Sequence, residues 1–311
     1  MSDILNGAEW HIENRDCIPG MASMPAASVD MSVFSPPFPA LYAYTDSAAD
    51  IGNVDVMGDE AKLHLRFFYT QLARILKPGR VAIVHVMQIP RMKRTGEVGL
   101  FDFRGLNIRL AERCGLVYEY DWAVRKNPQA QAIRTKSREL QFVGLEKDRA
   151  KTRGCLSDYL IKFRAPGDNA IPIDESGQVS RNAWIDWAEG TWMDIDENDT
   201  LNVSEGRDEK DVKHICPLQL EVYRRCILLF SDPGEIVFEP FVGIGSGGFM
   251  AMGGKSPKTG KKIDDPRRYF GFELKESYFG AARSNLKRAI DSRDRSVYRS
   301  LFAEPELEPV A

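Results

Sequence analysis

The chain has 311 residues, 43% of them hydrophobic and 28% charged, so it can bury a sizeable core and does not have the composition of a disordered protein. Its apolar stretches fall short of the roughly 18 to 20 uncharged residues of a membrane helix, the segment MSDILNGAEW lacks the pattern of a signal peptide, and the net charge of −3 gives no hint of a polyanionic partner. We therefore expect a cytoplasmic protein of one or two domains.

The first third of the chain alternates strand-like and helix-like segments. The pattern predicts strands at Trp10 to Asp16, Met31 to Ser35, Val81 to Met87 and Tyr118 to Val124, and helices at 18–30, Asp59 to Leu76 and Leu106 to Cys114. The run VAIVHVM is continuously apolar, as in a parallel strand buried on both faces. The amphipathic segment before it ends at Lys-Pro-Gly, which is typical of a helix stop.

From Pro128 to about Gly206 the pattern loosens, and only Asp158 to Arg164 reads as a good strand. Regular periodicity then returns with a helix at Leu218 to Phe230, a strand at Glu235 to Pro240, a glycine-rich turn with a further helix, a strand at Tyr269 to Leu274, and a last helix to about Ala289. Strands and helices that alternate on both sides of an irregular middle predict one α/β unit, with a mostly parallel, doubly wound sheet and an inserted region.

The glycine-rich turn runs from Phe238 to Gly248, directly between a strand and a helix. Glycines there let the backbone approach a ligand closely. The next strand ends near Glu273, where a carboxylate can accept hydrogen bonds from two ribose hydroxyls. This combination fits any Rossmann-like nucleotide site, including one for a dinucleotide.

The tetrapeptide Ser35-Pro36-Pro37-Phe38 follows the second predicted strand. An exocyclic amino group of a base is a poor nucleophile, because its lone pair is delocalised into the ring. Two acceptors, the Ser35 hydroxyl and the Pro36 carbonyl, could draw that nitrogen toward a tetrahedral geometry. Prolines hold such acceptors in place, and Phe38 offers a face on which an extruded base can stack.

Basic residues gather in two stretches of the chain. The segment Arg125 to Arg164 has 11 lysines and arginines against four acids, and Lys255 to Arg268 has six against two. A segregated basic surface is the electrostatic footprint of a nucleic-acid binder, although ordinary solvated faces can also be basic. The five cysteines, Cys17, Cys114, Cys155, Cys216 and Cys226, form no C-x-x-C pair, so we expect reduced thiols and no metal.

Taken together, these motifs resemble the amino-methyltransferases of bacterial and phage DNA modification, in the permuted group often called beta. In that group the catalytic tetrapeptide comes first, the target-recognition region lies in the middle, and the cofactor turn comes last. The resemblance covers about residues 10 to 290. It implies a Rossmann-like methyltransferase fold, S-adenosylmethionine as cofactor and double-stranded DNA as partner.

The resemblance also assigns roles to residues. Catalysis falls to Ser35, Pro36, Pro37 and Phe38, and cofactor binding to Asp16, Cys17, His214, Cys216, Gln219, Glu239, Phe241, Gly243, Gly245, Ser246 and Glu273. The stretch from Trp122 to Pro128 is similar to one that lies near the target base. Together with the basic middle it gives the DNA-contact candidates Arg125, Lys126, Asn127, Arg134, Lys136, Arg138, Arg149, Lys151 and Arg153. Glu239 departs from the usual aspartate.

The chain is thus divided into a catalytic half at 1–128, a target-recognition region at 129–206, a cofactor-binding half at 207–295 and a tail at 296–311. We expect methylation of N6 of adenine, slightly favoured, or of N4 of cytosine, by a solitary or phage-like enzyme that could form a homodimer. The alternatives are an RNA amino-methyltransferase and a DNA-binding protein without catalysis. A dinucleotide-dependent oxidoreductase would leave the Ser-Pro-Pro-Phe motif unexplained.

Overall fold

The computed structural model describes residues 10–39, 44–53, 58–91, 99–135, 142–174, 177–202 and 217–302. The strands are β1 (Trp10–Asn14), β2 (Val29–Phe34), β3 (Leu76–Met87), β4 (Ile89–Arg91), β5 (Gly99–Phe101), β6 (Val117–Val124), β7 (Asp158–Arg164), β8 (Thr191–Trp192), β9 (Ile236–Glu239) and β10 (Arg268–Glu273). The helices are α1 (Cys17–Ala22), α2 (Asp59–Ile75), α3 (Phe103–Arg113), α4 (Pro128–Thr135), α5 (Phe142–Lys147), α6 (Arg181–Trp187), α7 (Leu220–Phe230), α8 (Ser246–Ala251) and α9 (Glu276–Phe302), with 3-10 turns η1 (Ile51–Asn53) and η3 (Arg149–Lys151).

In this part of the chain eight strands form the main sheet, in the order β1-β10-β9-β2-β3-β7-β6-β8. All neighbouring strands are parallel except at β7, which is antiparallel to both β3 and β6. The predicted mostly parallel α/β sheet is therefore confirmed. The connection from β2 leads to β3 on one side of the sheet, and the connection from β9 leads to β10 on the other side. The strand order therefore reverses between β2 and β9, and open α/β sheets bind their ligands at such a point.

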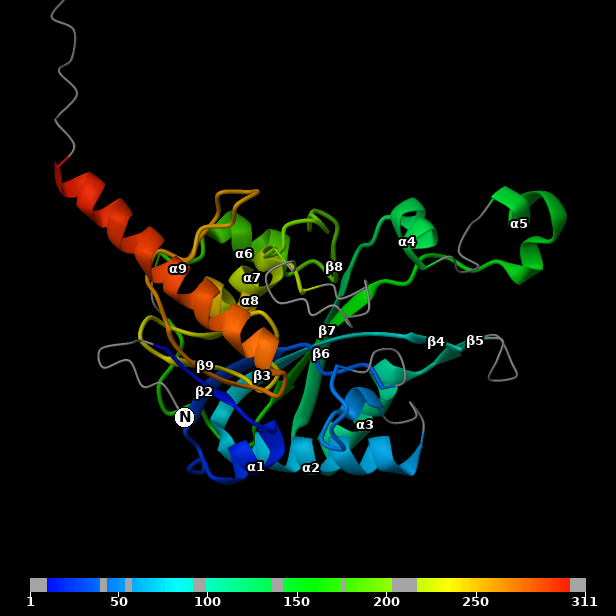
Figure 1. Cartoon of the computed structure of the whole chain (residues 1–311), viewed down its shortest axis with the longest axis horizontal. Coiled ribbons are helices and arrows are strands. Elements are labelled where there is room, and N and C mark those ends of the chain that lie inside the picture. The colour runs from blue at the N-terminus through cyan, green and yellow to red at the C-terminus, as the bar shows by residue number, and fades with distance from the viewer. Residues whose placement is uncertain are drawn as a thin grey trace, which may run out of the picture.

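Helices cover both faces of the sheet. In Figure 1, α1, α2 and α3 lie on one face, while α7, α8 and α9 lie on the other. The two faces carry separate apolar clusters, one containing Phe34, Phe68 and Phe163 and the other containing Val33, Ile227 and Leu286. Consecutive residues such as Val33 and Phe34 point to opposite clusters because strand side chains alternate, which explains the unbroken apolar run of β2.

Two of the predicted helices differ clearly in length from those observed. The helix predicted at 18–30 is the short α1, which ends at Ala22 in front of Pro25, because the residue before a proline disfavours the helical conformation. The last helix continues beyond Ala289 to Phe302. The predicted helix stop at Lys-Pro-Gly is confirmed, since α2 ends at Ile75 and these three residues lie at the start of β3, where Gly79 has φ +73°.

Two segments project from the same side of the sheet in Figure 1, namely the β4–β5 hairpin and the segment with α4 and α5. The hairpin follows the carboxyl end of β3, and the second segment, residues 125–157, connects β6 to β7. Met87 and Val124 both pair with Asp158 at this edge of the sheet. Since β7 and β8 both belong to the main sheet, the described parts of region 129–206 outside the sheet lie within 129–157, 165–190 and 193–202.

No helix in the described ranges is long and apolar enough to cross a membrane.

Candidate functional site

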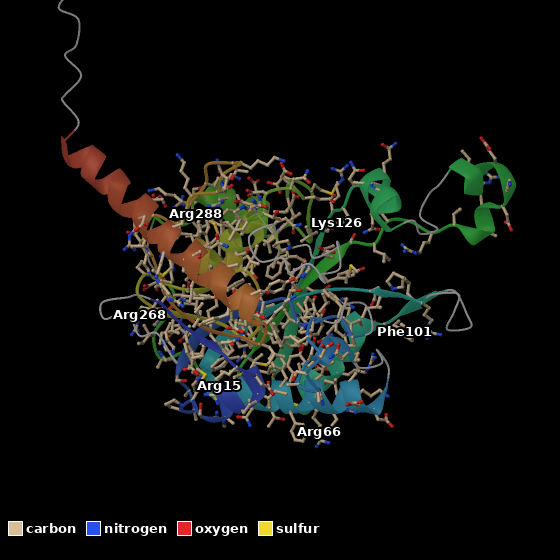
Figure 2. All side chains as sticks on the ribbon, in the orientation of Figure 1. Arg15, Arg66, Phe101, Lys126, Arg268 and Arg288 are labelled. Carbon is tan, nitrogen blue, oxygen red and sulfur yellow. The ribbon has the colours of Figure 1, made fainter. Side chains whose placement is uncertain are left out.

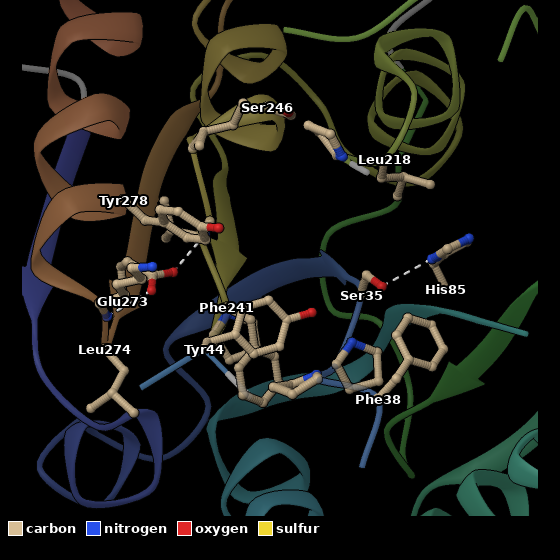
Figure 3. Close-up of a pocket in the computed structure, with 18 of the residues that line it drawn as sticks. Ser35, Phe38, Tyr44, His85, Leu218, Phe241, Ser246, Glu273, Leu274 and Tyr278 are labelled. Atoms are coloured by element: carbon tan, nitrogen blue, oxygen red, sulfur yellow. Dashed lines mark hydrogen bonds between the residues drawn. The ribbon is translucent and has the colours of Figure 1, made fainter. Parts of the chain in front are cut away.

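A cavity of about 290 Å³ opens at the carboxyl ends of β2, β9 and β10, where the strand order reverses. Figure 3 shows Glu273 on one side of it and Ser35 with His85 on the other. The residues predicted from the sequence that line it are Asp16, Cys17, Ser35, Pro36, Pro37, Phe38, Lys126, Gln219, Phe241, Gly243, Ser246 and Glu273. The fold thus brings together the catalytic tetrapeptide and most of the candidate cofactor residues, although more than 200 positions separate the tetrapeptide from Phe241, Gly243, Ser246 and Glu273.

The catalytic tetrapeptide begins one residue after β2, a strand whose six residues are all buried. Ser35 Oγ lies 3.0 Å from Nδ1 of His85. The ring of Phe38 is 9% exposed and packs 5.5 Å from the ring of Phe103. A rigid, buried strand therefore delivers Ser35 to the cavity with its hydroxyl already engaged on one side.

Behind Ser35 lie three residues from separate elements. His85 Nε2 lies 2.9 Å from Oδ2 of Asp158, although the contact lacks the alignment of a regular hydrogen bond. Lys126 Nζ lies 2.7 Å from the same oxygen. Burial alone would raise the pKa of Asp158, but its contacts with His85 and Lys126 outweigh burial and hold that pKa below its usual value. The sequence analysis missed His85 and Asp158; the signal for His85 was one histidine inside the apolar run VAIVHVM.

Glu273 closes the opposite side of the cavity. Its carboxylate accepts hydrogen bonds from the backbone N–H groups of Gly243, at 2.7 Å, and Lys275, at 2.8 Å. Burial raises the pKa of Glu273 to about 7, although these two N–H donors favour the ionised form. Gly243 and Gly245 have φ angles of +56° and +85°, which only glycine adopts freely, so the glycine turn can fold back onto the Glu273 carboxylate.

Besides His85 Nε2, buried polar atoms of two candidate cofactor residues on the cavity wall have no hydrogen-bond partner among the described residues. They are Ser246 Oγ, in the first turn of α8, and Gln219 Oε1, just before α7. The two residues are only 4% and 6% exposed. Because buried polar atoms are normally paired, these two indicate where a polar ligand would bind.

Asp16 and Cys17 lie at the start of α1. The Asp16 carboxylate accepts a hydrogen bond of 2.9 Å from the N–H of Ile18 and so caps the helix. Cys17 is buried, and burial raises the pKa of its thiol well above the usual value. Both side chains line the cavity, Cys17 as a small apolar surface rather than as a reactive thiolate.

Glu239 and Gly245 do not line the cavity. Glu239 is buried and accepts hydrogen bonds from the hydroxyls of Tyr223 and of Tyr269, the latter at 2.6 Å. Burial raises the pKa of Glu239 to about 8, although the tyrosine hydroxyls favour the ionised form. The Glu239 side chain, which is longer than the usual aspartate, thus links α7, β9 and β10 behind the glycine-rich turn.

Replacing Glu239 by glutamine should change how stability depends on pH. The ordinary pKa of the Glu239 carboxyl is 4.5, and its pKa in the folded protein is about 8. Between these two pH values the folded protein keeps a proton on Glu239 that the unfolded chain has lost, so wild-type stability falls as pH rises through this window. Glutamine does not titrate, so the variant should be more stable than wild type at pH 8, by an amount on the order of 4 kcal/mol. Urea unfolding at pH 5 and pH 8 measures the difference.

Glu221 gives a control of opposite sign. Arg224 and Arg225 outweigh burial and lower its pKa to about 2, so Glu221→Gln should reduce stability at pH 8. If Glu239→Gln instead parallels Glu221→Gln, the Glu239 carboxylate is ionised in the folded protein and the raised pKa assigned to it is wrong.

A loop that the motifs did not indicate covers part of the cavity. Tyr44, Thr45 and Asp50 line the wall. The Asp50 carboxylate ties the loop together, since it accepts hydrogen bonds from the N–H groups of Tyr44, Thr45 and Gly52 at 2.7 to 2.8 Å. Figure 3 draws Tyr44 among the residues that line the cavity. A loop of small and polar residues carries no catalytic signature, so only the structure assigns it to the site.

The DNA-contact candidates have different surroundings. Arg125 and Arg149 are exposed, whereas Asn127 caps α4 by accepting hydrogen bonds from the N–H groups of Gln129 and Ala130 at 3.0 and 3.2 Å. Arg153 is half-buried. His214, Cys216, Lys136 and Arg138 lie outside the described residues, and the side chains of Arg134 and Lys151 are likewise not described.

The comparison that decides the family covers most of the chain. A family described as DNA methylase, acting at N6 or N4, matches residues 29–284. The chain belongs to the N6/N4 DNA methylase family. The matched range spans both the catalytic tetrapeptide and the glycine turn, so the two motifs that face each other across the cavity lie within the family's shared part.

Solved structures agree with this methylase in fold. TTHA0409 of Thermus thermophilus, assigned as a DNA modification methylase and solved in complex with S-adenosyl-L-methionine, is 19% identical with a TM-score of 0.64, over 90% of this chain and 93% of that one. PvuII DNA methyltransferase, which is cytosine-N4-specific, is 16% identical with a TM-score of 0.62, over 93% of both chains. The predicted methyltransferase fold is therefore confirmed. No curated protein matches the methylase.

Proposed function

We propose that this methylase transfers a methyl group from S-adenosylmethionine to the exocyclic amino group of a base flipped out of double-stranded DNA. The observation that carries the proposal is the cavity itself. Ser35 and Phe38 line one side of it, and the unpartnered atoms Gln219 Oε1 and Ser246 Oγ and the Glu273 carboxylate line the rest. The membership of the DNA methylase family gives the reaction class.

The residues present fit the cofactor. Glu273 would accept hydrogen bonds from the ribose hydroxyls, while Gln219 Oε1 and Ser246 Oγ would bind the methionine end, which carries both a donor ammonium and an acceptor carboxylate. Phe241 and Cys17 supply apolar walls beside them. When bound, S-adenosylmethionine supplies an electrophilic methyl group on a sulfonium. The similar fold of TTHA0409 in its S-adenosyl-L-methionine complex supports this assignment.

On the other side of the cavity, the chain's own residues would hold the base. Phe38 stacks on the ring, and the Ser35 hydroxyl and the Pro36 carbonyl accept the two amino hydrogens. These contacts orient the nitrogen lone pair toward the methyl group, so the rate arises mainly from positioning and preorganised electrostatics. We favour N6 of adenine slightly over N4 of cytosine, in a solitary or phage-like enzyme of the permuted beta group.

DNA would bind at the edge from which both projecting segments leave the sheet. We propose that 129–206, apart from β7, is the target-recognition region, between a catalytic half at 1–128 and a cofactor half at 207–295. Figure 2 shows Lys126 beside α4 and Phe101 at the hairpin, both on this side of the molecule. A homodimer is part of the proposal, but the proposed chemistry does not depend on it.

Reversing the charge of Arg125 and Arg149 should weaken DNA binding. For every phosphate that is no longer bound, the slope of log affinity against log salt should fall by about 1, while S-adenosylmethionine affinity stays the same. Fluorescence anisotropy with labelled duplex DNA at several salt concentrations measures the DNA affinity and its salt slope. Arg66→Glu is the matched control, since Arg66 is exposed on α2 far from Lys126 in Figure 2. Equal reductions of affinity in both proteins would place the DNA elsewhere.

The function is tested by single-molecule sequencing of DNA from cells that express the wild-type protein or Ser35→Ala. A methylated adenine or cytosine in one sequence motif, present only with the wild type, would establish the reaction, the base and the recognition site together. DNA without modification in both strains would contradict the proposal and favour RNA or a non-catalytic role.

A further inference from the structure

We infer that His85 and Asp158 form a proton relay behind Ser35, which fixes the direction of the Ser35 hydroxyl and takes up the proton that the amino nitrogen loses on methylation. The inference rests on the proposed function, because it concerns the same Ser35. It adds two positioning residues that act through Ser35 and do not themselves touch the base.

The relay is a continuous chain of contacts across four elements. Ser35 follows β2, His85 lies on β3, Asp158 begins β7 and Lys126 follows β6. The successive distances are 3.0 Å from Ser35 Oγ to His85 Nδ1, 2.9 Å from His85 Nε2 to Asp158 Oδ2, and 2.7 Å from that oxygen to Lys126 Nζ. Figure 3 shows the Ser35 to His85 contact as a dashed line at the cavity wall.

The charge of Asp158 selects the tautomer of His85. With an ionised carboxylate 2.9 Å from Nε2, the ring carries its hydrogen on Nε2, because a lone pair there would face a negative oxygen. Nδ1 then has a free lone pair and accepts the hydroxyl hydrogen of Ser35. Consequently both lone pairs of Ser35 Oγ are directed away from His85, and one can accept an amino hydrogen of the base.

The reaction supplies the reason for a base behind the serine. As the nitrogen–carbon bond forms and the sulfur–carbon bond breaks, the positive charge moves from sulfur to the amino nitrogen, which must lose a proton. A serine hydroxyl is a weak base. With His85, the amino proton passes to Ser35 Oγ while the proton of Ser35 passes to Nδ1, and the positive charge ends on an imidazolium beside Asp158.

The surroundings of His85 limit which groups can take this role. Among the residues that the structure describes, Lys126 after β6 is the charged group that contacts Asp158, and Glu197 lines the cavity near them. The ring of Phe38 meets His85 edge-on at 6.5 Å. Before proton transfer, the positive charge of Lys126 offsets the negative charge of Asp158, and His85 is neutral. After the transfer, the positive charge of the His85 imidazolium lies beside the Asp158 carboxylate.

The test is the pH dependence of single-turnover methyl transfer to unmethylated phage DNA by wild type, His85→Asn, Asp158→Asn and Ser35→Ala. Wild type should slow toward acidic pH, because a protonated imidazole cannot accept the proton of Ser35. His85→Asn should be about 10²-fold slower and lose this acidic limb, while its affinity for S-adenosylmethionine stays within about threefold. In a Ser35→Ala background the His85 change should have little further effect, because the relay acts through Ser35.

A readout without turnover uses ¹⁵N-histidine labelling of the full chain, which has four histidines. The His85 ring should show the form with hydrogen on Nε2, and Asp158→Asn should shift the equilibrium toward the other tautomer. His11→Asn is the matched control, since His11 also pairs with a carboxylate, at 2.9 Å from Glu13, but does not line the cavity. Hydrogen on Nδ1 in wild type, or an acidic limb that survives in His85→Asn, overturns the relay alone; a wild type that methylates no DNA overturns the proposed function as well.

Discussion

Replacing Ser35 by alanine is expected to lower the rate of methyl transfer by about 10²- to 10³-fold, with little change in the affinity for S-adenosylmethionine. The hydroxyl lies on the base side of the cavity, 3.0 Å from His85, whereas the candidate cofactor contacts come from Glu273, Gln219 and Ser246. Because the interaction strengthens only as the nitrogen becomes tetrahedral, its loss should reduce kcat and kcat/KM by similar factors. Steady-state methylation with tritiated cofactor and calorimetric titration measure the two effects separately.

Ser32→Ala is the matched control, because it makes the same change three residues earlier in the same chain segment. Ser32 is buried, donates a hydrogen bond of 2.9 Å to the carbonyl of Phe238, and does not line the cavity. It should cost about 1 kcal/mol of stability and leave the rate nearly unchanged. If Ser35→Ala loses cofactor affinity in parallel with activity, Ser35 belongs to the cofactor side and its proposed role is wrong.

The sequence predicts the parts of the site that are local. A strand, a glycine turn and a helix follow one another between Ile236 and Ala251, and the tetrapeptide at Ser35 directly follows a strand. Each of these segments sets its own geometry through proline or glycine, so its chemistry can be recognised without knowing what lies opposite.

The part that the sequence does not reveal depends on long-range pairing. The strand at Asp158 was predicted, but its antiparallel position between β3 and β6 was not, and only that position aligns Asp158 with Met87 and brings it to His85. Lys126 was assigned to DNA because it lies in the stretch that resembles one near the target base and in the basic middle of the chain. In the structure it pairs with Asp158 and lines the cavity. Composition indicates where charges lie along the chain but not which partner each one meets.

Replacing Glu273 by glutamine should weaken S-adenosylmethionine binding by about 10²-fold and remove its pH dependence. A carboxylate that accepts two ribose hydroxyls makes two charge-assisted hydrogen bonds, whose joint loss corresponds to about 3 kcal/mol. In addition, Glu273 is held by the N–H groups of Gly243 and Lys275, and the amide of glutamine would direct its own N–H groups toward one of these donors.

The pKa of Glu273, raised by burial to about 7, gives the sign of the pH effect. Ribose hydroxyls donate to the ionised form, so binding should release a proton, and affinity should fall by about tenfold from pH 8 to pH 6 in wild type. Calorimetry in buffers of different ionisation enthalpy measures both the affinity and the proton release. Glu13→Gln controls for the loss of a carboxylate on the adjoining strand β1, because Glu13 itself does not line the cavity, although its partner Arg15 does. A pH dependence that persists in Glu273→Gln would assign it to another carboxylate of the cavity, with Asp50 the first to test.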